Sequence, residues 1–145
     1  MRFIIILLFL FSTQSISKEY IIDSSSDVKS KEIIIDEGFK YTVVEIENRW
    51  TDSFGEYGTG NCFGHILTRG EIITLNLFCE QMDSKGDKFW TNLKRESEMD
   101  AGIGKITYLK GTGKYKKFEN LKCTYAVRYM NRKTNFLRQK CKINF

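Results

Sequence analysis

The chain of 145 residues contains no proline, a single histidine and no long amphipathic helical pattern. The absence of Pro excludes collagen-like chains and Pro-rich linkers, so tight turns must be formed by Gly, Asn, Asp and Ser. An apolar content of 41% and an aromatic content of 14% suffice for a packed core and exclude an intrinsically disordered chain. The length favours one domain, and neither an internal repeat nor a low-complexity linker divides the chain.

The first 17 residues have the pattern of a secretory signal peptide. Met1 and Arg2 precede nine consecutive apolar residues, Phe3–Phe11, and Ser15 and Ser17 stand where a signal peptidase selects small side chains. Nine apolar residues fall well short of the roughly 20 that span a bilayer. No later stretch is long and apolar enough to cross a membrane. We therefore expect a periplasmic or secreted protein, cleaved near Ser17, rather than an integral membrane protein.

Export changes the interpretation of the four cysteines, because an even number of Cys in an oxidising compartment favours disulfides. Their wide spacing and the single His make a structural zinc site improbable. Three pairings are possible. The sequence midpoints between Cys62 and Cys79 and between Cys123 and Cys141 both fall in turn-like segments, so each pair can face across a hairpin. We predict the disulfides Cys62–Cys79 and Cys123–Cys141.

The rest of the chain shows the alternation of apolar and polar residues that is typical of strands. Residues 18–40 are polar, Ser-rich and acidic, and we expect a loosely ordered N-terminal arm with at most one edge strand. Residues 41–145 form one domain with expected strands at Tyr41–Glu47, Gly58–Thr68, Ile72–Glu80, Lys88–Arg95, Lys105–Lys110, Leu121–Tyr129 and Phe136–Ile143. A polar loop is expected at Glu96–Gly104, and one helical turn within Gly111–Asn120. The predicted fold class is all-β, a small antiparallel barrel or sandwich of six to eight strands with two disulfides.

Two short motifs suggest ligands that their surroundings exclude. Gly111-Thr112-Gly113-Lys114 lacks the first Gly of a phosphate-binding P-loop and is followed by Tyr115, where Ser or Thr must hold magnesium. Asp83–Asp87 resembles part of a calcium loop, but Lys94 occupies the position of the closing Glu, so a hairpin turn is favoured. We predict no metal site and no cofactor.

A wider resemblance is carried by Gly86–Trp90 (GDKFW), followed by Gly111–Phe118 (GTGKYKKF), with cysteines on the flanking strands. Residues 55–145 resemble uncharacterised small secreted bacterial proteins, and their strand–GTGKY–strand connection is similar to that of allene oxide cyclase and dirigent-like barrels. The resemblance implies an antiparallel calycin-like barrel. It supplies no catalytic residue.

Candidate pocket residues are His65, Trp90 and Tyr108. His65 is the only side chain whose unperturbed pKa lies near neutral pH, and Trp90 and Tyr108 belong to an aromatic cluster in the central strands. Each has an equally simple interpretation as a packed core residue. No nucleophile–base set can be assembled from the sequence, so we predict no catalytic residues.

The net charge of +5 hides an uneven distribution. Residues 18–104 hold ten basic and 17 acidic side chains, whereas residues 105–145 hold twelve basic side chains and one acidic. The basic third either offsets neighbouring acidic strands or forms a dock for an anionic lipid or glycan surface. The candidate residues for that dock are Lys116, Lys117, Lys122, Arg128, Arg138, Lys140 and Lys142.

These patterns lead to several functional hypotheses. The first is a non-catalytic protein that binds a small apolar molecule inside the barrel or an anionic envelope surface outside it. The alternatives are an isomerase or cyclase that uses His65 and a carboxylate in the barrel mouth, and a secreted interaction or inhibitor module without a pocket. Nucleic acid is not expected as a partner of an exported protein, and the sequence leaves the oligomeric state open.

Overall fold

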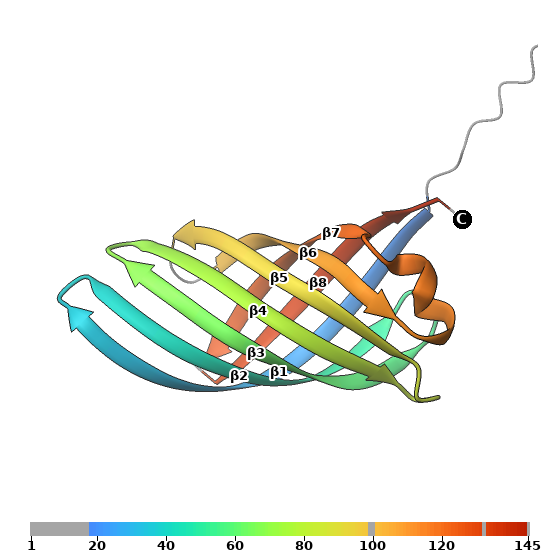
Figure 1. Cartoon of the computed structure of the whole chain (residues 1–145), viewed down its shortest axis with the longest axis horizontal. Coiled ribbons are helices and arrows are strands. Elements are labelled where there is room, and N and C mark those ends of the chain that lie inside the picture. The colour runs from blue at the N-terminus through green and yellow to red at the C-terminus, as the bar shows by residue number, and fades with distance from the viewer. Residues whose placement is uncertain (1–17, 99–100, 132, 145) are drawn as a thin grey trace, which may run out of the picture.

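Residues 18–98, 101–131 and 133–144 are described by a computed structural model (Figure 1). Eight antiparallel strands follow one another around a closed barrel, each paired with the next in sequence and the last with the first. The elements are β1 (Lys18–Asp36), β2 (Phe39–Asp52), β3 (Tyr57–Arg69), β4 (Ile72–Asp83), β5 (Lys88–Glu98), β6 (Ala101–Gly111), the 3-10 helix η1 (Gly113–Phe118), β7 (Lys122–Asn131) and β8 (Thr134–Ile143). The predicted all-β class is confirmed as an eight-stranded barrel.

The expectation of a loosely ordered N-terminal arm is wrong for most of its length. β1 is the longest strand, and it pairs with β2 on one side and, over Lys18–Asp27, with β8 on the other. Its inward positions include Tyr20, Ile22 and Ser26, all buried. The Ser-rich composition hid a period-two pattern in which small polar side chains face the interior.

The strands are strongly staggered. Following paired residues around the barrel from Ile21 of β1, through β8 and each strand in turn, leads back to β1 at Lys31, ten residues further along. This stagger tilts the strands against the barrel axis. It also leaves the β1–β2 and β3–β4 hairpins projecting beyond the other strands at one end (Figure 1).

The polar loop predicted at Glu96–Gly104 is likewise shorter than expected, because β5 continues to Glu98 and β6 begins at Ala101. Gly102 and Gly104 lie within β6. A Cβ at Gly104 would overlap the Tyr125 ring, and one at Gly102 would lie 2.6 Å from Arg95 Cδ. These glycines leave space for large side chains of the neighbouring strands, so here they are strand residues rather than turn residues.

Both predicted disulfides are confirmed. Cys62 lies opposite Cys79 on β3 and β4, and Cys123 lies opposite Cys141 on β7 and β8, with each pair bonded directly across a hairpin. All four cysteines are buried in the barrel core. Two such bonds are compatible with an oxidising, extracytoplasmic location. The predicted signal peptide, residues 1–17, lies outside the described residues.

Replacing Cys62 and Cys79 together by Ala should lower the free energy of unfolding by about 3 kcal/mol, because the unfolded chain regains the entropy of an open loop. Urea unfolding at neutral pH measures the change. The double replacement at Cys123 and Cys141 should cost a similar amount, since the two sequence separations are 17 and 18 residues. A loss below about 0.5 kcal/mol for either pair would contradict this loop-closure account.

One end of the barrel is closed by aromatic side chains. Tyr115 and Phe118 of η1 are buried, with ring centroids 4.7 Å from Phe89 and 4.9 Å from Tyr20, respectively. Such offset and tilted ring contacts stabilise the packing beyond the area they bury. The group is named the aromatic plug and consists of Tyr20, Trp50, Phe89, Tyr108, Tyr115 and Phe118.

Two turns at this closed end share the sequence pattern Asp-Ser-x-Gly followed by an acidic residue. Asp52 accepts backbone N–H groups two and four residues later, both at 2.9 Å, and Asp83 does the same at the same distances. Gly55 and Gly86 take positive φ values of 84° and 89° in the equivalent positions. The calcium-like motif Asp83–Asp87 is therefore a hairpin turn organised by its own first carboxylate.

The two motifs of the sequence meet at this turn. Lys114, of the Gly111–Lys114 motif, forms ion pairs with Asp83 at 2.6 Å and with Glu56 at 3.0 Å, and the Tyr115 hydroxyl donates to Asp83 at 3.3 Å. Burial alone would raise the pKa of the Asp83 carboxyl. The contact with Lys114 and the two backbone N–H groups outweigh burial and hold that pKa below its ordinary value. Lys114 thus links η1 to two turns instead of binding phosphate.

Asp83→Asn should destabilise the barrel by about 2 kcal/mol at neutral pH. Because the pKa of Asp83 is depressed in the folded state, its carboxylate stabilises the protein at pH values above the ordinary aspartate pKa. That stability is lost as the pH falls through the folded-state pKa of Asp83. Urea unfolding measured from pH 7 into the acid range should therefore show a smaller loss of unfolding free energy for Asp83→Asn than for the wild type.

The matched control is Asp27→Asn, which removes an exposed carboxylate paired with Arg49 at 3.1 Å. Because both partners are solvated, this change should cost less than about 0.5 kcal/mol. If the unfolding free energies of the wild type and Asp83→Asn fall equally steeply with decreasing pH, Asp83 is not the source of the acid sensitivity.

Candidate ligand-binding site

The barrel interior contains a cavity of about 80 Å³. Its walls are mainly apolar and include Leu75, Leu77 and Leu93 from β4 and β5. The aromatic plug blocks the end that carries η1. At the opposite end, Tyr129 lines the cavity and is 40% exposed, which marks this end as the mouth. The interior is therefore a site with one closed and one open end.

Several buried polar atoms of the cavity lining have no hydrogen-bond partner among the described residues. These are Asn48 Oδ1, Trp50 Nε1 and Gln81 Oε1. A buried donor or acceptor left without a partner costs about 1–3 kcal/mol. A ligand or ordered water in the cavity would recover that free energy, so these atoms provide polar contacts in a mainly apolar site.

Arg95 is the one charged side chain in the described lining of the cavity. The residue is 5% exposed, and its Nε and Nη1 atoms have no hydrogen-bond partner within the described part of the chain. Its guanidinium lies 6.0 Å from the centre of the Tyr129 ring. The mouth of the cavity therefore carries a buried positive charge.

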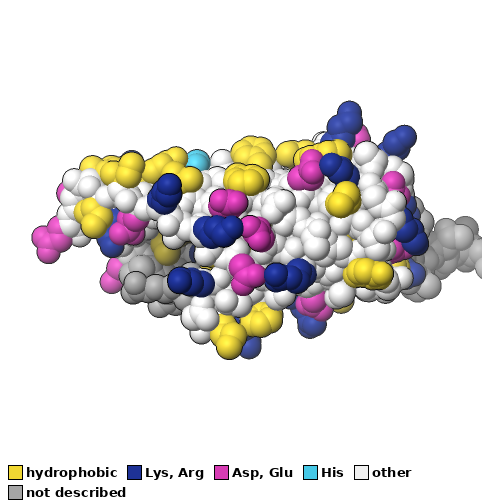
Figure 2. Space-filling model, turned by 90° about the horizontal axis from the view of Figure 1, so that it is seen from below, with side chains coloured by type: hydrophobic (Ala, Val, Ile, Leu, Met, Phe, Trp, Pro, Cys, Tyr) yellow, Lys and Arg dark blue, Asp and Glu magenta, His cyan; other side chains and the backbone are white. Residues whose placement is uncertain are grey.

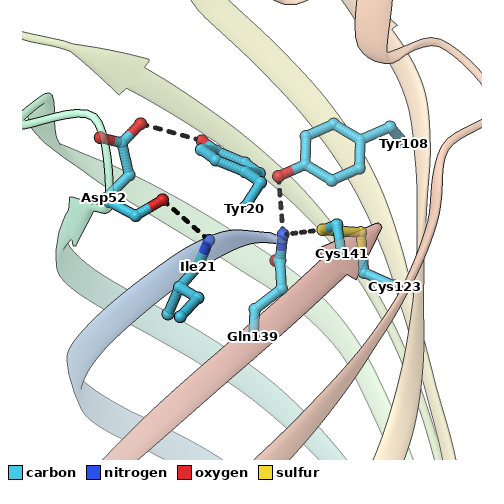
Figure 3. The surroundings of a disulfide bond; sticks show 8 residues. Tyr20, Ile21, Asp52, Tyr108, Cys123, Gln139 and Cys141 are labelled. Carbon is cyan, nitrogen blue, oxygen red and sulfur yellow. Dashed lines mark hydrogen bonds between the residues drawn. A yellow bond between two sulfur atoms is a disulfide. The ribbon is translucent and has the colours of Figure 1, made fainter. Parts of the chain in front are cut away.

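Beside the Cys123–Cys141 disulfide, hydrogen bonds join members of the aromatic plug to Gln139, which lines the cavity (Figure 3). Gln139 Nε2 donates to the Tyr108 hydroxyl at 2.8 Å and lies 3.1 Å from Cys141 Sγ. The Tyr20 hydroxyl donates to Asp52 at 3.1 Å. Burial is the main reason that the pKa values of Tyr20 and Tyr108 lie above the ordinary tyrosine value, so both phenols stay neutral and act as structural groups.

The three residues expected to line a pocket fall in different places. Tyr108 points inward but is fully buried in the aromatic plug and, contrary to expectation, does not line the cavity. His65 and Trp90 lie on the outer face and do not line the cavity, contrary to expectation: His65 stacks on Tyr41, and Trp90 Nε1 donates to Glu80 at 2.9 Å. The reason is strand alternation, because Cys62 and Phe89 point inward and fix the opposite orientation for His65 and Trp90.

The seven residues of the predicted anionic-surface dock are all exposed, on η1, β7 and β8. Two of them are paired with carboxylates of β1. Arg138 forms a bidentate contact with Asp23 at 2.7 and 2.9 Å, and Lys140 lies 3.5 Å from Glu19. Figure 2 shows basic, acidic and apolar side chains interspersed over one outer face of the barrel. The basic strands are thus partly offset by the acidic strand beside them.

Sequence reasoning missed the charged residue of the site, Arg95, and also its polar lining residues Asn48 and Gln81. The inward positions of β5 run Phe89, Thr91, Leu93 and then Arg95, so the cation continues an apolar face. A charged residue in register with core positions is the signal that could have identified it. The composition of the segment concealed this signal, since Lys94, Arg95 and Glu96 together resemble the start of a solvated loop.

Comparison of the chain with protein-family models and with curated protein sequences finds no match. Among the described residues, no helix has the length and apolar character needed to cross a membrane. In the same part of the chain, no three His, Cys, Asp or Glu side chains gather in a way that could hold a metal ion. The fold and the interior are therefore the basis for assigning a function.

Proposed function

We propose that this protein is an extracytoplasmic, non-catalytic binding protein that holds a small, mainly apolar molecule inside its barrel. The carrying observation is the cavity itself, which has mainly apolar walls, a closed aromatic end and a partly exposed mouth. A few of its buried polar atoms have no partner in the part of the chain that the structure describes. Ligand sites typically combine such apolar walls with a small number of placed polar groups. Barrels of eight strands enclose enough space for one small ligand.

The volume limits the size of the ligand. About 80 Å³ is several times the roughly 10–15 Å³ that a single water requires. It is well below the roughly 300–1,000 Å³ of pockets that hold drug-sized molecules. The site suits a molecule with a short hydrocarbon body rather than a long lipid chain.

The other hypotheses have less support. An isomerase or cyclase of the expected kind needs His65 with a carboxylate in the barrel mouth, but His65 lies outside, and the described lining of the cavity contains no carboxylate. The anionic-surface dock is weakened by the pairing of Arg138 and Lys140 with carboxylates. An interaction module without a pocket would leave the cavity and its unpaired polar atoms unexplained.

The proposed relationship to uncharacterised small secreted bacterial proteins, with a barrel resembling those of allene oxide cyclase and dirigent-like proteins, rests on the sequence resemblance alone. The two segments that carry it, Gly86–Trp90 and Gly111–Phe118, lie together at the closed end, where Lys88 N–H donates to Thr112 Oγ1 at 2.7 Å. These segments close the barrel and do not line its mouth. The relationship therefore concerns the scaffold and transfers no activity.

Filling the cavity tests the proposed function. Val127 points into the cavity and is buried, whereas its neighbour Ala126 points outward on the same strand. Val127→Phe should abolish binding of n-pentanol, monitored by backbone amide NMR shifts of the lining residues. The overpacked variant should also lose about 1–3 kcal/mol of stability.

Ala126→Phe is the matched control, because it adds the same ring to the outer face and should leave n-pentanol binding unchanged. If the amide shifts of the wild type do not saturate with n-pentanol, or spread over residues of the outer surface, the cavity is not a binding site. Equal binding by wild type and a folded Val127→Phe variant would lead to the same conclusion.

A further inference from the structure

The charge in the cavity is of one sign. The lining within residues 18–98, 101–131 and 133–144 contains Arg95 and no Asp or Glu. The described ion pairs of the protein all lie elsewhere, at the surface or at the closed end. A buried guanidinium without a counter-charge is unfavourable for folding, because it loses hydration without gaining an ionic partner.

The position of Arg95 is nevertheless built into the strands around it. A Cβ on Gly102 would lie 2.6 Å from Arg95 Cδ and 3.2 Å from its Nε, so the absence of a side chain at Gly102 lets the arginine stem lie against β6. The same Cβ would lie 2.9 Å from Ser97 Oγ, another buried atom without a hydrogen-bond partner in the described part of the molecule. Two groups that can donate to an anion therefore lie beside the same glycine.

Aromatic residues complete the surroundings. Tyr129 covers the guanidinium from the mouth, and Tyr125 lies close enough for the positive charge of Arg95 to influence its phenol. Burial raises the pKa of Tyr125 to about 12, although Arg95 acts in the opposite direction. The Tyr125 hydroxyl is thus a neutral hydrogen-bond donor near neutral pH, and it adds no negative charge to the site.

We propose that the ligand is a small organic anion, a carboxylate with a short apolar body, whose head group binds to Arg95 at the mouth of the barrel. This inference rests on the proposed function and specifies its ligand class. Arginine presents a planar set of N–H donors that matches a carboxylate in a bidentate geometry. The hydrocarbon body then extends toward Leu75, Leu77 and Val127, which line the same cavity.

The proposal predicts a preference between two probes of equal chain length. Calorimetric titration of the full chain at pH 7 should give an affinity for pentanoate at least about tenfold higher than that for n-pentanol, since charge-assisted hydrogen bonds are the stronger kind. Arg95→Met should remove this preference, because it weakens the binding of pentanoate and leaves the binding of n-pentanol nearly unchanged. Arg95→Lys should retain part of it, because the charge remains but the planar fork is lost.

Two further variants separate charge from position. Lys94→Met removes the same charge from the exposed neighbouring position on β5 and should leave the preference intact. Gly102→Ala keeps Arg95 but takes up the space beside its stem, so pentanoate should bind less tightly while n-pentanol is unaffected.

Stability gives a readout that is independent of binding. Arg95→Met should raise the urea midpoint of the unliganded protein, because it removes a buried charge that no described carboxylate compensates. A strongly lowered midpoint would assign Arg95 a structural role and overturn the proposal. Equal wild-type affinities for pentanoate and n-pentanol would overturn the anion assignment alone, whereas binding of neither probe would overturn the proposed function as well.

Discussion

The pairing of β1 with β8 is the constraint on which the whole molecule depends. Ten consecutive residue pairs, from Lys18–Ile143 to Asp27–Thr134, close the sheet on itself and remove the edges that an open sheet would expose there. Closure also fixes which side chains point inward, because a shift of one residue would turn each strand's inward set outward. The two disulfides, the aromatic plug and the inward position of Arg95 all require this register.

Within that register the interior changes character along the barrel axis. Rings pack densely at the end closed by η1, where Asp52 and Asp83 organise their turns and accept hydrogen bonds from Tyr20 and Tyr115. Between the plug and the mouth the lining is mainly aliphatic. Buried polar atoms without a partner among the described residues occur along it, from Trp50 Nε1 in the plug to Arg95 at the mouth. The groups that burden folding therefore lie along the whole interior, and the one charged side chain of the described lining lies at the mouth. Unfavourable buried groups of this kind are typical of binding sites, where they persist because a ligand compensates them.

The sequence predicted the scaffold better than the site. Strand alternation and turn-like midpoints sufficed for the two disulfides, because residues facing across a hairpin are related by local geometry. β1 escaped prediction because Ser24 and Ser26 face a partly polar interior, so its alternation is not one of apolar against charged residues. Arg95 escaped for a related reason. Its role depends on the neighbouring strand, above all on Gly102, and on a described lining that contains no carboxylate. Whether a cation is solvated or enclosed is a property of the closed barrel, not of its own segment.

The placement of the chain ends has a consequence for how such a barrel can be attached to something else. β1 begins and β8 ends at the plugged end, as Figure 1 shows beside η1, while the mouth lies at the far end of the long axis. Anything joined to either of these strand ends therefore emerges behind the aromatic plug. A barrel immobilised through them would face outward with its entrance free, and a label fused there would report on the molecule without obstructing the path to Arg95.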